Sequence, residues 1–279
     1  MKIGFMSSTC PNYTVREIVD ACTRLGFQGF EPRIDWGHAH GLEPGASPQA
    51  IRAARAIWED AGVEVPCIAS GIATAVRGPE RVKELDQVQR VVELSRLVGS
   101  RYVRVFGKGA PGLDEESRMQ LAIETLSEAA ELIAGSGVTL LLETHDYFRA
   151  GRMVGQVVRT VNRPDEVAVL WDTMHSVVVG ETLAETAAHL GLERVKHTHF
   201  RDLWLKGEKE DGTLATKPCY DYGQGNFPLR EATRLLTEAG YTGYASLEVI
   251  FKPTDRTHDP EAFLAAHARG MKLIHQSGA

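Results

Sequence analysis

Short apolar stretches alternate with longer amphipathic stretches along the whole chain. In the longer stretches the apolar residues recur at helical spacing, as at Val88, Val91 and Val92. This alternation is typical of repeated strand–helix units around a parallel sheet. The strand-like stretches are Ile3–Met6, Gly29–Ile34, Val63–Ala69, Tyr102–Phe106, Thr139–Thr144, Val167–Asp172, Val195–Phe200 and Ala245–Ile250.

Eight such stretches in a chain of 279 residues fit a closed barrel, since barrels of about 250 residues form one domain. We therefore predict an α/β fold, a single (β/α)8 TIM barrel that occupies residues 1–279. One connection is long, from about residue 202 to 227, and it carries the charged run from Lys206 to Gly212. We expect this charged loop to form a lid or a rim.

Four consecutive predicted strands carry an acid or a histidine after their apolar residues, near the carboxyl end: Glu143, Asp172, His199 and Glu248. In a parallel barrel the strand ends meet at one mouth, where active sites form. A buried carboxylate is costly unless it is paired or bound to metal, and converging carboxylates raise one another's pKa unless a cation keeps them ionised. The four side chains therefore predict a site for one divalent metal.

The alternation of side chains along a strand refines the assignment in the seventh strand. His199 lies nearer the mouth than His197, so His199 is the predicted ligand, and Arg201 lies at the rim. Three carboxylates and one imidazole suit Mn2+, our first choice, with Mg2+, Co2+ and Zn2+ as alternatives. Four protein ligands also leave positions for two adjacent substrate oxygens.

Other polar residues near the predicted mouth have two interpretations each. His145 is either a hydrogen-bonded structural residue or a substrate contact, and His38 and His40 either line the pocket or belong to an exposed loop. Lys108 either binds phosphate or is solvated. The glycines around it lack the spacing of a phosphate-binding P-loop.

With these strand ends in place, the chain resembles the xylose isomerase-like TIM barrel superfamily of sugar phosphate isomerases and epimerases, which also includes endonuclease IV. The resemblance covers nearly the whole chain. Its most specific segments are Leu142–His145, Trp171–His175, His197–Asp202, Tyr222–Leu229 and Ser246–Glu248.

The resemblance to ketose 3-epimerases in this superfamily implies roles for individual residues. Glu143 and Glu248 would be both metal ligands and the proton-transferring pair, and His175 would contact substrate. His145, Arg149 and Arg201 are further candidates for substrate binding.

The function implied is a metal-dependent sugar or sugar phosphate isomerase or epimerase, acting beside a carbonyl through a metal-stabilised enediolate. A dehydratase of an inosose-like or dehydroshikimate-like substrate is an alternative, with His175 or His145 as the acid, and a carbohydrate-binding barrel without activity is another. Endonuclease IV would need further histidines from earlier strands. The segments Ile68–Gly71 and Val105–Lys108 supply none.

The resemblance implies a small carbohydrate as the partner, and composition argues against other classes of partner. A net charge of −6 argues against nucleic-acid binding, no apolar run is long enough for a bilayer, and four cysteines without C-x-x-C spacing indicate neither zinc knuckle nor disulfide framework. We expect a cytoplasmic protein without a signal peptide. Trp36, Trp204 and Tyr220 are candidates for a homodimer contact or a lid.

Overall fold

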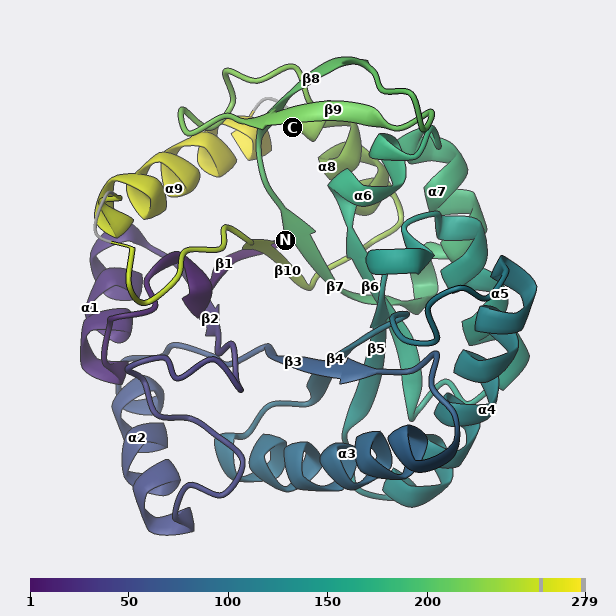
Figure 1. Cartoon of the computed structure of the whole chain (residues 1–279). Coiled ribbons are helices and arrows are strands. Elements are labelled where there is room, and N and C mark those ends of the chain that lie inside the picture. The colour runs from purple at the N-terminus through teal and green to yellow at the C-terminus, as the bar shows by residue number, and fades with distance from the viewer. Residues whose placement is uncertain (256–257, 277–279) are drawn as a thin grey trace.

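Eight parallel strands form one sheet in the computed structural model, which describes residues 1–255 and 258–276. The order is β2-β1-β10-β7-β6-β5-β4-β3, and bridges from Gly29 to Glu64 and from Arg33 to Ala69 join the two edge strands. The predicted TIM barrel is confirmed (Figure 1). The strands are β1 (Lys2–Met6), β2 (Gly29–Glu31), β3 (Cys67–Ala73), β4 (Tyr102–Phe106), β5 (Thr139–Glu143), β6 (Val167–Asp172), β7 (Val195–Phe200) and β10 (Tyr244–Leu247).

Helices surround this sheet and bury their apolar faces against it (Figure 1). Local signals set their limits: Thr14 and Glu17 form a capping box at the start of the first helix, and Gly99 ends the third in the left-handed conformation at φ 83°. The helices are α1 (Val15–Leu25), α2 (Pro48–Asp60), α3 (Gly78–Val98), α4 (Glu115–Ile133), α5 (Gly151–Val161), α6 (Thr173–Val178), α7 (Leu183–Leu190), α8 (Leu229–Glu238) and α9 (Pro260–Gln276).

The predicted strand limits match best for the four strands in the middle of the chain, β4 to β7. The strands β4, β6 and β7 have the predicted bounds, whereas β3 begins at Cys67 and not at Val63. Pro66 has no N–H to donate to a neighbouring strand, and only Glu64 in the preceding segment forms a bridge. The strand therefore starts after the proline and continues to Ala73.

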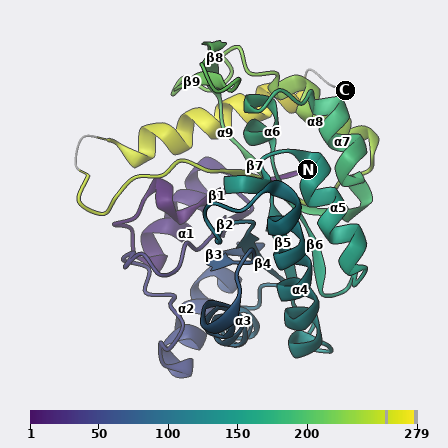
Figure 2. The same ribbon diagram turned by 45° about the vertical axis from the view of Figure 1, so that its right-hand side comes forward.

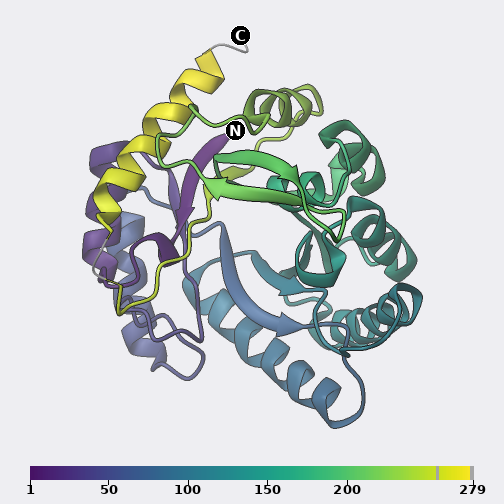
Figure 3. The same cartoon turned by 45° about the horizontal axis from the view of Figure 1, so that its top comes forward.

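The long connection after β7 is not a simple loop, because much of it is an antiparallel hairpin. The strands β8 (Leu203–Glu208) and β9 (Leu214–Pro218) pair with each other, and the charged residues between them form the turn. Figure 2 shows this hairpin projecting beyond the helices, and in Figure 3 it lies across the mouth of the barrel. No helix in the described ranges is long and apolar enough to span a membrane.

Candidate metal centre

The four predicted metal ligands lie together inside the mouth of the barrel. Glu143 and Asp172 are the last residues of β5 and β6, His199 lies in β7, and Glu248 follows β10 directly. All four are buried, and one ligand atom from each lies within 4.8 Å of the others. His199 Nδ1 is 2.8 Å from Glu143 Oε1 and 3.6 Å from Glu248 Oε2.

Backbone contacts fix the orientation of Asp172. Its Oδ1 accepts a hydrogen bond from the backbone N–H of Met174 at 2.8 Å and thereby caps α6. Its own N–H donates to Thr144 Oγ1 at 2.9 Å, and this hydroxyl donates to the Asp172 carbonyl at 3.0 Å. The segment after β5 therefore positions the carboxylate at the end of β6, while its Oδ2 is turned toward the other ligands.

Two arginines balance the charge of the carboxylates. Arg201 Nη2 lies between Asp172 and Glu248 and contacts both. Arg104, in β4, donates to Glu248 Oε1 at 3.1 Å, and its Nε lies 3.5 Å from Glu143 Oε2. Burial alone would raise the pKa of Glu248, but the positive charges of Arg201, His199 and Arg104 hold it well below the usual range.

Asp172 behaves in the opposite way. Burial raises its pKa, and the negative charge of Glu248 raises it further against the attraction of Arg201. A further cation close to Asp172 would favour its ionised form.

This donor set fits one divalent metal ion. Metal–oxygen and metal–nitrogen bonds of about 2.0–2.3 Å place ligand atoms on opposite sides of an ion slightly more than 4 Å apart. The 4.8 Å limit on the spacing of the four ligand atoms is compatible with that size. Glu143 Oε2 is also buried without a hydrogen-bond partner among the described residues, so it has an unused lone pair.

Glu31, in β2, is part of the site although the sequence did not indicate it. Its Oε2 lies 3.0 Å from Nε2 of both His199 and His197, and all three residues are fully buried. A carboxylate that accepts from the far ring nitrogen orients a metal-binding histidine and makes it a better ligand. His197 lies deeper in the barrel than His199, as expected, and supports Glu31 from below.

The predicted substrate contacts His175 and His145 lie next to the ligands. His175 Nε2 is 3.6 Å from Asp172 Oδ2, and the ring centroids of the two histidines are 4.4 Å apart. Burial and the charges of Arg201 and His145 lower the pKa of His175 to about 3. Burial opposes protonation of His145 too, but a hydrogen bond to Asp146 and the charges of Glu143 and Glu248 raise its pKa.

The remaining candidates lie farther from the ligands. Arg149 donates from Nε to the carbonyl of Asp146 at 3.1 Å and is half-buried. His38 and His40 are buried and not part of an exposed loop surface: His38 Nδ1 lies 3.1 Å from Ser7 Oγ. Burial lowers the pKa of both histidines to about 4, so both are neutral at pH 7.

A cavity of about 240 Å³ adjoins the metal ligands beneath the hairpin. Glu248 and Arg201 line its inner end, and Tyr220, Phe251 and Phe263 line its apolar side. A ligand in this cavity can reach Glu248, one of the metal ligands.

Asp202 fixes the chain that follows the hairpin. Its Oδ2 accepts hydrogen bonds from the N–H groups of Gly223 at 2.7 Å and Gly225 at 2.9 Å. A Cβ on Gly225 would lie 2.2 Å from Asp202 Oδ1, so this segment requires glycine. The motif at Tyr222–Leu229 therefore anchors the hairpin over the cavity.

The chain is similar to several proteins of known structure or function. Fructoselysine 3-epimerase of Shigella flexneri is 23% identical over 265 residues, which cover 90% of each chain. The structure of the IOLI protein with a binding zinc atom matches with a TM-score of 0.80 at 18% identity, covering 100% of this chain and 99% of that one. The probable 3-DHS dehydratase AsbF of Bacillus anthracis matches at 0.76 and 16%, covering 98% and 99%. Residues 19–271 match the family model of the xylose isomerase-like TIM barrel, and the chain belongs to that family.

Proposed function

We propose that the protein is a divalent-metal-dependent enzyme that isomerises or epimerises a sugar or a sugar phosphate. The activity named for the Shigella relative, 3-epimerisation of a sugar derivative, supports this class of reaction. The family and the buried ligand set support a metal at the barrel mouth.

The placement of Glu143 and Glu248 is the observation that carries the proposal. Glu143 comes from β5 and Glu248 from the end of β10, with β6 and β7 between them in the barrel wall. Their carboxylates therefore approach the centre from different directions, and His199 Nδ1 lies between them. One glutamate can remove a carbon-bound proton, and the other can return a proton to a different face or to the neighbouring carbon.

A divalent ion held by Glu143, Asp172, His199 and Glu248 would act as a Lewis acid on a substrate carbonyl beside the proton that is removed. The protein residues supply the rest. Arg201, His199 and Arg104 together hold Glu248 in its ionised form, so that this carboxylate can accept a proton at pH 7. Neutral His175, next to Asp172, can donate or accept one hydrogen bond to a substrate hydroxyl.

The native metal remains part of the proposal. Three carboxylates and one imidazole favour Mn2+, while the zinc atom named for the structurally similar IOLI protein supports Zn2+ as the first alternative. Arg149 and Arg201 stay as proposed substrate contacts, Arg201 because it reaches both the cavity and the ligands.

Dehydration is a second candidate, and His145 is the observation that favours it. Its raised pKa makes it an acid that can protonate a departing hydroxyl, whereas His175 is neutral. The name of AsbF, a probable 3-DHS dehydratase, is consistent with this chemistry on the same fold.

Proton exchange with solvent tests the proposal directly. The purified protein with Mn2+ is incubated in D2O with ketoses, ketose phosphates and keto-inositols, and NMR follows deuterium uptake and products. Deuterium beside the carbonyl, lost with EDTA, is the expected result, and the product distinguishes isomerisation, epimerisation and dehydration. A ligand that protects the protein against unfolding but neither exchanges nor reacts would instead indicate a binding protein.

A further inference from the structure

Arg33 is a buried cation without a carboxylate partner. It follows β2, only 6% of its surface is exposed, and its Nη1 donates to the carbonyls of Ser70 at 2.7 Å and Ala69 at 3.3 Å. No ion pair joins it to a carboxylate in the described ranges. Its guanidinium also lies 4.5 Å from the ring centroid of Trp36, and the charges of Glu248, Glu143 and Asp35 act on it without direct contact. A buried arginine is stabilised further by an anion in direct contact, and that partner is missing here.

A second cation lies beside it at the mouth. A Cβ built on Gly71 would lie 3.6 Å from Arg33 Nη2 and 4.0 Å from Lys108 Nζ, so both cations border the same small space above β3. Lys108 is half-buried and likewise has no ion-pair partner within the part of the chain that the structure describes. Glycine at position 71 keeps that space open.

A continuous wall of side chains connects Lys108 with the metal ligands. Lys108 Nζ lies 5.2 Å from the ring centroid of Phe106, which is 4.7 Å from that of His145. His145 contacts His175, and His175 Nε2 lies 3.6 Å from Asp172 Oδ2. The two cations thus follow strands β2 and β4, across the barrel from His199 in β7. Side chains in and just after β4, β5 and β6 link the two cations to the metal ligands.

We propose that Arg33 and Lys108, on either side of Gly71, form an oxyanion subsite that binds a phosphate or carboxylate group of the substrate. The inference rests on the proposed function and deepens it, because it names acidic sugars as the substrate class. Arg33 presents a planar pair of donors and Lys108 a point charge, a combination suited to oxygen anions. The metal ligands then act on the uncharged part of the same molecule.

Binding of simple anions to the metal-free protein tests the subsite without any turnover. Inorganic phosphate and acetate are titrated separately at constant ionic strength, with chloride as the compensating salt, and NMR measures the dissociation constants. We expect saturable binding that weakens about tenfold in Lys108→Gln, because a charge-assisted hydrogen bond contributes about 1.5 kcal/mol. The anion that binds more tightly identifies the substrate group as phosphate or carboxylate.

Matched variants separate the subsite from general charge effects. Lys83→Gln and Arg90→Gln remove exposed cations on the outer face of α3 and should leave anion binding unchanged. Arg33→Gln should abolish binding, and since this residue is buried, Lys108→Gln provides the test if Arg33→Gln does not fold.

Anion binding that is absent from the wild type, or equal in Lys108→Gln and the wild type, would overturn the subsite. Deuterium exchange in the metal-loaded wild type is measured in parallel. Exchange without anion binding would leave the proposed function intact and remove only the subsite. Anion binding without exchange of any substrate would support the subsite and contradict the proposed function.

Discussion

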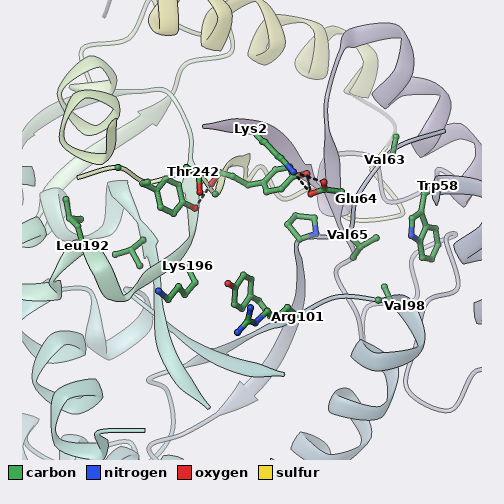
Figure 4. Close-up of a pocket in the computed structure, with 18 of the residues that line it drawn as sticks. Lys2, Trp58, Val63, Glu64, Val65, Val98, Arg101, Leu192, Lys196 and Thr242 are labelled. Atoms are coloured by element: carbon green, nitrogen blue, oxygen red, sulfur yellow. Dashed lines mark hydrogen bonds and ion pairs between the residues drawn. The ribbon is translucent and has the colours of Figure 1, made fainter. Parts of the chain in front are cut away.

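The two ends of the barrel differ in the size of their cavities and in how far their charged side chains are buried. The amino ends of the strands surround a cavity of about 630 Å³, lined by Lys2, Glu64, Arg101 and Lys196 among others (Figure 4). The cavity beside the metal ligands at the other end measures about 240 Å³. Size alone would place the functional site at the amino end.

The burial of the charged side chains places the functional site at the carboxyl end instead. Lys2 and Glu64 form an ion pair of 2.6 Å at the amino end, with side chains about half exposed (44% and 54%). Such a pair forms at little cost, because water still solvates both groups. At the carboxyl end, Glu143, Asp172 and Glu248 are almost completely withdrawn from water and have an arginine or histidine against each of them. Fold stability gains little from such a cluster, so its presence indicates function.

The largest expected contrast is between a carboxylate at each end. Glu248→Gln should lower deuterium exchange by about 10²- to 10⁴-fold, because an amide cannot act as a base. Glu64→Gln, at the amino end, should leave the rate within a factor of about two. NMR in D2O with saturating Mn2+ measures both, and circular dichroism verifies the fold.

Exchange by Glu248→Gln at the wild-type rate would remove this residue from proton transfer. A large loss in Glu64→Gln would show that the amino-end cavity participates, and the comparison between the two ends would have to be abandoned.

A smaller effect is expected for Glu31. Glu31→Gln keeps the shape of the side chain but removes the charge that orients His199, and Mn2+ affinity should fall about 10- to 100-fold. Isothermal titration calorimetry of the metal-free protein measures it, with Glu64→Gln as the control. Equal Mn2+ affinity in the wild type and Glu31→Gln would mean that His199 needs no orienting carboxylate.

Glu31 also marks the limit of what the sequence could predict. Glu143, Asp172 and Glu248 could be identified because each ends a strand-like apolar run, where the topology of a parallel barrel gathers side chains. Glu31 ends a strand of only three residues, and its contact with His199 joins residues 168 positions apart. Such a contact depends on barrel closure, which no local pattern encodes.

The sequence did contain a signal that Arg104 belongs to the site. It lies between Val103 and Val105 in a strand whose bounds were predicted correctly, and alternation places an arginine on the face opposite to these valines. An arginine inside a barrel needs anions nearby, so it could have been paired with the glutamates. The hairpin over the cavity could not be predicted in this way, because the charged run from Lys206 to Gly212 reads as a loop although most of it adopts strand or turn structure.

The pH dependence of the free energy of unfolding should reveal the buried charge of Glu31 at the carboxyl end. Burial alone would raise the pKa of Glu31, but His199 and His197 lower it below the ordinary 4.5. Its contribution is therefore present above pH 4.5 and is lost as the pH falls through the lowered value. Urea unfolding of the metal-free wild type at pH 6 and pH 3.5 should reveal a loss about 1–2 kcal/mol greater than in Glu31→Gln. A parallel loss in both proteins would contradict this assignment.

The smallest effect is expected at the amino end itself. Lys2→Gln removes the ion pair with Glu64, but Tyr244 Oη still donates to that carboxylate at 2.7 Å. The free energy of unfolding should change by about 1 kcal/mol or less, and the change should shrink as salt screens the pair. Urea denaturation at low and high salt measures both. A larger, salt-independent loss of stability would mean that the pair behaves as a buried one. The charges at the amino end would then resemble those at the mouth, and cavity size would again be a reasonable guide to the functional site.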